Sequence, residues 1–157
     1  MAYYYSRKLQ IPFDEAVQRA IQNLQQQGFG IVTTIDLKET LKQKLNIDFR
    51  KYRIIGACNP QFAFQAVSLE SHIGLMLPCN VVVQEHENGE VEVSAINPLE
   101  TIDNITATAQ LAVIAQEIGN RLRVAIDTLE HGKPEENLPQ ALPTDYTSTE
   151  LNISIPG

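Results

Sequence analysis

The sequence has few cysteines, no cluster of basic residues and no long apolar run. Its 157 residues include 12 Lys and Arg against 19 Asp and Glu, a net charge of −7. Nucleic acids and anionic membrane surfaces are bound through clustered positive charge, so neither is an expected partner. No apolar segment approaches the roughly 20 residues that span a bilayer, and the first residues lack the pattern of a signal peptide. We therefore expect a cytoplasmic protein whose two cysteines stay reduced.

Length and composition predict a single domain followed by a tail. A chain that is 43% hydrophobic and 20% charged is typical of a globular protein, and 157 residues can bury a core. From residue 131 onward apolar residues become sparse, and four of the eight prolines lie there. We expect one α+β domain over residues 1–130 and a proline-containing, partly disordered C-terminal tail over residues 131–157.

Apolar periodicity locates the secondary structure. Residues 3–9, 30–37, 52–57, 80–85 and 90–96 have strand patterns, and helical patterns cover residues 13–27, 36–46, 60–69 and 107–129. The dipeptide Asn88-Gly89 predicts a two-residue hairpin turn in which both residues take positive φ. The apolar stretch 72–78 is expected to be an irregular connector. This order indicates an α+β fold with helices on one face of a mainly antiparallel sheet.

Both cysteines are followed by asparagine and have a proline nearby. Cys58-Asn59-Pro60 ends one predicted strand, and Pro78-Cys79-Asn80 begins another. If these strands are antiparallel neighbours, both segments reach one edge of the sheet. If the strands are parallel or not adjacent, the two thiols are separated. A disulfide requires Cα atoms within about 7 Å, a distance that the sequence leaves open.

The same residues also have a purely structural interpretation. Free cysteine is often buried and packs as a small hydrophobic residue. Asn59 suits the N-cap of a helix, and Pro60 then stands at the first helical position. Asn80, at the start of a strand, could equally hold a loop in place.

Three functional hypotheses stand beside this interpretation. In the first, the Cys-Asn segments bind a small molecule or a soft metal ion, because thiolates favour Cu(I) and Zn(II). His72 is then the candidate third ligand beside Cys58 and Cys79, and a dimer could add two more thiols. In the second, Cys58 has a pKa lowered by the helix start and acts as a nucleophile or redox thiol, although no Cys-x-x-Cys motif is present. In the third, the last helix or the tail binds another protein.

Two segments give the chain a family resemblance. "GACNPQFAFQAV" followed by "IGLMLPCNVVVQE" resembles the paired signature of the bacterial and archaeal family called domain of unknown function 302, and the similarity extends from Tyr5 to Leu129. The resemblance implies a β-α-β(4)-α fold and a homodimer, and it implies neither an activity nor a cofactor. The best interpretation is a small-ligand or metal-binding module with a paired Cys-Asn site. A thiol-dependent redox enzyme and a non-catalytic interaction protein with structural cysteines are the alternatives.

Overall fold

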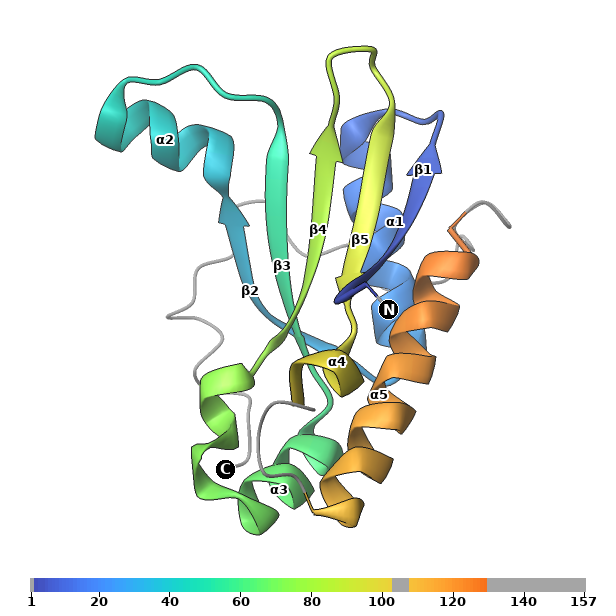
Figure 1. Ribbon diagram of the computed structural model, residues 1–157. Helices are drawn as coiled ribbons and strands as arrows, with labels where there is room; N and C mark the ends of the chain where they lie inside the picture. The colour runs from blue at the N-terminus through green and yellow to red at the C-terminus, as the bar shows by residue number, and fades with distance from the viewer. Residues whose placement is uncertain (1, 103–107, 130–157) are drawn as a thin grey trace.

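The computed structural model describes residues 2–102 and 108–129, and these residues form the predicted α+β fold (Figure 1). Five strands make one antiparallel sheet in the order β1-β5-β4-β3-β2. The strands are β1 (Tyr4–Leu9), β2 (Gly30–Asp36), β3 (Tyr52–Cys58), β4 (Cys79–Glu85) and β5 (Val91–Ile96). The helices are α1 (Phe13–Gln26), α2 (Leu37–Leu45), α3 (Pro60–Leu69), the 3-10 helix η1 (Ser71–Met76), α4 (Pro98–Ile102) and α5 (Ala109–Asp127). The predicted tail and Ala107 lie outside the described residues.

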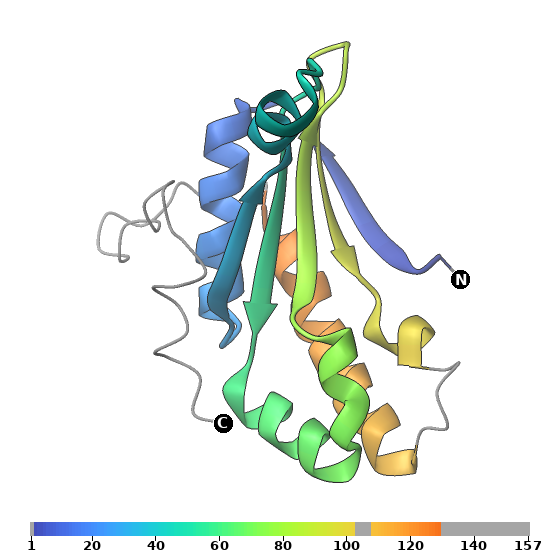
Figure 2. The same cartoon turned by 90° about the vertical axis from the view of Figure 1, so that its left-hand side faces the viewer.

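Helices α1 and α5 pack on one face of the sheet and bury it (Figure 2). The apolar stripe that predicts α1 is buried throughout, at Phe13, Ala16, Val17, Ala20, Ile21 and Leu24. Opposite these side chains, Ile55 of β3 and Val83 of β4 are 0% exposed. We call this side of the sheet the covered face.

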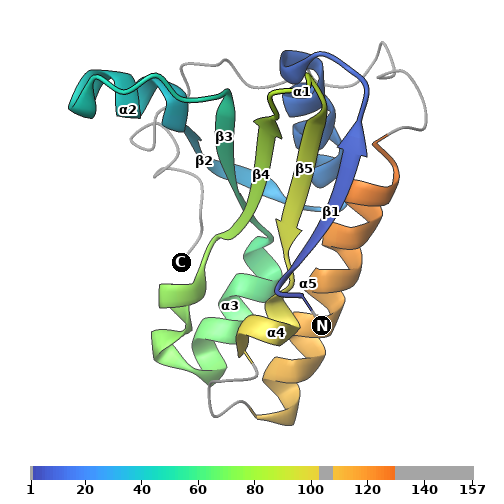
Figure 3. The same cartoon turned by 45° about the horizontal axis from the view of Figure 1, so that its top comes forward.

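The opposite side, which we call the open face, has no described helix lying across it (Figure 3). Side chains alternate along a strand, so in β4 and β5 the open-face positions lie next to buried ones. In β5, for example, Val91, Val93 and Ala95 are buried whereas the residues between them are half-buried. The predicted arrangement with the helices on one face is therefore confirmed for α1 and α5.

The β4–β5 hairpin is confirmed, but its predicted two-residue turn is wrong. The amide of His86 donates to the carbonyl of Glu90 at 2.8 Å, so three residues close the loop. Only Gly89, with φ +83°, takes the left-handed conformation in this turn. Asn88 contributes through its side chain, which accepts a hydrogen bond from the Glu90 amide at 3.0 Å. A glycine that closes a three-residue loop is a common alternative to the two-residue turn.

The apolar connector is helical, and it helps to form an exposed apolar end of the molecule. Residues 71–76 form η1, which begins where the Glu70 carboxylate accepts a hydrogen bond from the His72 amide at 3.0 Å. Helix α3 buries only Ala66, and Phe64 and Leu75 are 62% and 85% exposed. We call α3 and η1 the helical end. Within residues 2–102 and 108–129, every helix is too short or too polar to cross a membrane.

Candidate functional site

The two Cys-Asn segments meet at one end of the sheet, because β3 and β4 are antiparallel neighbours. Ala57 pairs with Cys79, and Gly56 pairs with Asn80. A Cβ atom at Gly56 would lie 2.2 Å from Thr33 Oγ1 and 2.8 Å from Pro78 Cγ. The absence of a side chain at this position therefore lets Thr33 and Pro78 close over the strand.

Both cysteines are free and buried, yet they have different surroundings. Because Ala57 pairs with Cys79, the alternation of side chains points Cys58 to the other side of the sheet. Cys79 belongs to the main hydrophobic core, whereas Cys58 is part of neither core cluster. The strands thus bring the two backbone segments together and direct the thiols apart.

The electrostatics of both thiols oppose nucleophilic chemistry. Burial raises the pKa of Cys58, so the expected lowering of this pKa by the helix start is wrong. Burial, and secondarily a charge on Cys58, raises the pKa of Cys79 to about 11. A thiol with a raised pKa is almost entirely protonated at neutral pH, and the protonated form is a poor nucleophile and metal ligand.

Asn59 and Pro60 have the structural roles that helix capping predicts. Asn59 is the N-cap of α3, with its side-chain oxygen accepting from the Phe62 amide at 3.2 Å, and Pro60 is the first helical residue. The Asn59 side chain also donates to the carbonyl of Gly28 at 3.2 Å. This bond ties the start of α3 to the turn after α1, and both functions of the side chain are therefore structural.

Cys79 and Asn80 line separate hollows. Cys79 lies on the wall of an apolar cavity of about 40 Å³, together with residues such as Ile73, Leu111 and Ile118. Asn80 is exposed and lines a hollow of about 330 Å³ on the open face. The cavity beside Cys79 has the size of a few water molecules at most.

His72 lies in η1, where its side chain is 84% exposed and contacts the Glu70 carboxylate at 3.2 Å. Across the described ranges, His, Cys, Asp and Glu side chains form no group of three or more that could hold a metal ion. A metal site on Cys58, Cys79 and His72 therefore stays a prediction, and it requires ligands from a second chain.

The open face carries a feature that the sequence interpretation missed. Ile35, Ile54 and Val82 are paired across β2, β3 and β4 and form an apolar row, which we call the aliphatic row. The hollow beside this row is lined by Tyr3 and Tyr4 from the N-terminal end of the chain and by Tyr52 from β3. A signal was present in the sequence, since Ile54 and Ile55 are adjacent and residues 81–83 are all valine. Such uninterrupted apolar runs are typical of strands that are covered on both faces.

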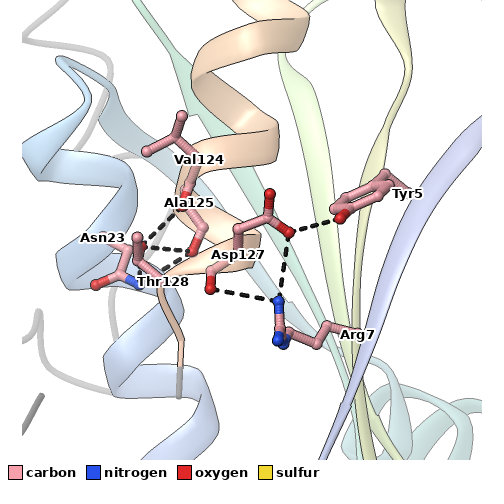
Figure 4. A network of polar contacts seen from close by, with 7 residues as sticks. All are labelled: Tyr5, Arg7, Asn23, Val124, Ala125, Asp127 and Thr128. Carbon is pink, nitrogen blue, oxygen red and sulfur yellow. Dashed lines mark hydrogen bonds and ion pairs between the residues drawn. The ribbon is translucent and has the colours of Figure 1, made fainter. Parts of the chain in front are cut away.

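A polar network fastens α5 to β1 and α1 (Figure 4). The Tyr5 hydroxyl donates to Asp127 Oδ1 at 2.5 Å, and Arg7 Nη1 donates to the same oxygen at 3.4 Å. The hydrogen bond to Asp127, followed by burial and the charge of Asp127, raises the pKa of Tyr5. On the other side of α5, Asn23 Nδ2 donates to the carbonyl of Ala125 at 3.0 Å. These contacts hold the Tyr5 ring in one place at the edge of the sheet.

Comparison with known proteins assigns a family. Residues 5–129 match the family model described as domain of unknown function DUF302. The fold is similar to the crystal structure of an uncharacterized conserved protein DUF302 from Bacillus stearothermophilus, with a TM-score of 0.75 and 28% sequence identity over 81% of this chain and 98% of that one. The curated proteins contain no match to this sequence. The chain belongs to the DUF302 family.

Proposed function

We propose that this member of the DUF302 family is a non-catalytic binding protein that works as a homodimer, with the open face as the surface between the two subunits. The observation that carries this proposal is the aliphatic row of Ile35, Ile54 and Val82 on a sheet face without a described helix over it. An antiparallel sheet that faces water normally alternates apolar inward residues with polar outward ones. The row breaks that alternation at the centre of the sheet.

The residues around the row have the character of a protein interface. Three tyrosines line the adjoining hollow, and tyrosine is enriched at the centres of interfaces. Charged side chains of the open face lie toward one margin, where Lys8 pairs with Glu92 in the strand register. Charge at the rim and apolar or aromatic side chains at the centre favour association of two such faces.

The size of the face fits a second copy. The open face of one subunit has five strands about 4.8 Å apart and about 20 Å long, which gives an area of roughly 500 Å². Two such faces in contact would bury roughly 1,000 Å² in total. That area reaches the lower limit for a specific interface, and the tyrosine side chains extend it. A two-fold axis through the aliphatic row would place like residues against like residues, as in most homodimers.

The state of the thiols favours binding over catalysis. Both cysteines are buried, and burial raises the pKa of each. The start of α3, which was expected to lower the pKa of Cys58, is capped by the Asn59 side chain. We place the protein in the cytoplasm, where reduced structural thiols are stable.

The experiment compares the oligomeric state of three proteins by light scattering during gel filtration. The wild type is expected to be a dimer, and Val82→Lys is expected to be a folded monomer because two buried lysines would face each other. Leu75→Lys places the same charge at the helical end and should leave the dimer intact. A monomeric wild type, or a dimer that Leu75→Lys breaks and Val82→Lys does not, would contradict the proposal.

A second candidate is the binding of a small apolar ligand beside Cys79, which one observation favours. Cys79 shares its cavity with η1 and α4, two short elements at the edge of the core. Displacement of η1 would enlarge a cavity that now measures about 40 Å³. Native mass spectrometry of gently purified protein tests this candidate: extra mass in the wild type that is absent from Cys79→Leu supports it, and equal masses after correction for the substitution refute it.

A further inference from the structure

A crevice between α5 and the ends of β1 and β5 has the properties of a ligand site, and it is separate from the Cys-Asn segments. Its volume is about 290 Å³, close to the lower limit for small-molecule sites. Its floor is apolar and includes the buried residues Ala95, Ala115 and Leu122. Its polar residues come from α5, from β1 (Tyr4 and Tyr5) and from Asn97, which lies between β5 and α4.

The charge of the crevice is opposite to that of the protein. The whole chain carries a net charge of −7, yet the described residues that line the crevice include Arg123 and neither Asp nor Glu. The Arg123 guanidinium lies over the Tyr5 ring at 4.8 Å, and the described residues provide it with no carboxylate partner. The Tyr5 ring is itself held by Asp127, as Figure 4 shows. Within the part of the chain that the structure describes, the cation is therefore positioned without being neutralised by an ion pair.

Two side-chain amides on the crevice wall have hydrogen-bond donors to spare. Asn120 Oδ1 accepts from Gln116 Nε2 at 3.0 Å, and the Asn120 amide nitrogen donates to no described residue. Asn97 uses its backbone, whose amide donates to the Tyr3 carbonyl at 2.7 Å, and its side chain has no partner in the described ranges. A guanidinium and two amide groups form a set of N–H donors suited to a carboxylate.

Gly119 is the third feature that points to an occupant. It lies inside the 19-residue helix α5, where glycine is less stable than alanine. Packing does not require a glycine there, since a Cβ atom would meet only Pro98 Cδ at 3.6 Å, an ordinary contact. The residue lines the crevice, so its lack of a side chain keeps the crevice open.

From these observations we infer that the crevice binds a small organic monocarboxylate, with the carboxylate on Arg123, Asn97 and Asn120 and a short apolar body on the floor. The combination of one cation, amide donors and an apolar floor distinguishes such a ligand from inorganic phosphate, which would leave the floor unfilled. The three donor residues lie outside the open face, and Tyr4 lines both this crevice and the hollow of the open face.

The test is a nitrogen-15 NMR titration of the full chain with benzoate, with benzamide and inorganic phosphate as comparison probes. Benzoate should shift the side-chain amide signals of Asn97 and Asn120 in a saturable way. Benzamide should have an affinity at least about tenfold lower than that of benzoate, because it lacks the negative charge. Saturable binding of phosphate in place of benzoate, or no saturable shift with benzoate at millimolar concentration, would overturn the inference.

Three variants locate the site. Arg123→Gln should weaken benzoate binding about tenfold or more, and Gly119→Leu should abolish it by filling the crevice. Arg50→Gln is the matched control, since Arg50 lies outside the crevice and contacts Gln84 and Phe49. Unchanged backbone spectra outside the crevice would establish that each variant is folded. Equal benzoate affinity in the wild type and Arg123→Gln would overturn the inference.

Discussion

Three consecutive valines in β4 compare the two faces of the sheet directly. Val81 and Val83 are 0% exposed on the covered face, whereas Val82 between them is half-buried on the open face. The three residues are of the same type and lie in the same strand. The difference in their exposure therefore comes from what packs against each face of the sheet. The covered face finds its partner within the chain, in α1 and α5. The apolar open face lacks such a partner among the described helices, which is why we assign it a second subunit.

The largest expected effect is a difference in stability between alanine variants of the neighbouring residues Ile54 and Ile55 in β3. Ile55 is 0% exposed on the covered face, and Ile55→Ala should lower the free energy of unfolding by about 2–5 kcal/mol. Ile54 belongs to the aliphatic row, and Ile54→Ala should cost less than about 1.5 kcal/mol in dilute solution, where subunits are separated. Urea unfolding at two protein concentrations measures both. Equal costs at low concentration would mean that the two faces do not differ as described.

The next effect distinguishes the two cysteines. Cys79→Ser places a hydroxyl without a partner in an apolar cavity and should cost about 1–3 kcal/mol. Cys58→Ser should cost less, because Cys58 lies outside both core clusters. Thermal unfolding of the two variants provides the measurement, with Cys79→Ala as a control that lacks the unpaired hydroxyl. A larger cost at Cys58 would reverse our assignment of Cys79 to the core.

Alkaline pH should weaken the covered face through Cys79. Its pKa is about 11 in the folded protein and 9.0 in the absence of the fold, so the unfolded chain loses the proton first. The resulting stability is present below about pH 9 and is lost as the pH rises to about 11, a loss on the order of 1–3 kcal/mol. Unfolding measured across this range in the wild type and in Cys79→Ala isolates the contribution. Parallel pH profiles of the two proteins would show that the thiol is not buried in its protonated form.

The smallest effect concerns the crevice beside α5, which the covered side leaves unfilled. Gly119→Ala should raise the free energy of unfolding by about 0.5–1 kcal/mol, because alanine favours the helix and its Cβ would make only an ordinary contact with Pro98. A rise in the melting temperature would confirm that the fold does not need the glycine. A fall would mean that α5 approaches α4 too closely for a side chain, and Gly119 would then be a packing residue.

Much of the fold was predictable because local patterns determine it. The stripe of α1, the alternation in β5 and the N-cap at Asn59 each depend on neighbouring residues, and each is confirmed. The prediction of a two-residue turn at Asn88-Gly89 was wrong, because the dipeptide suits two loop geometries that differ in hydrogen bonding at His86.

The candidate site was harder to predict because it depends on contacts between distant segments. The pKa of Cys58 is set by burial, which adjacency to a helix start does not reveal. A run such as residues 81–83 lacks a period, so it does not tell which face will be covered. Gly119, inside the predicted helical segment 107–129, was a local sign of the crevice.

The most direct test of the central claim, that the open face joins two subunits, is an isotope-filtered NMR experiment on a mixed dimer. One subunit carries carbon-13 methyl groups and the other is unlabelled, so only contacts between subunits give signals. We predict intermolecular contacts from the methyl groups of Ile54 and Val82 to the aliphatic row and tyrosine rings of the partner. Intermolecular contacts confined to Leu75 and the helical end, or a protein that stays monomeric at the concentration of the experiment, would contradict the account.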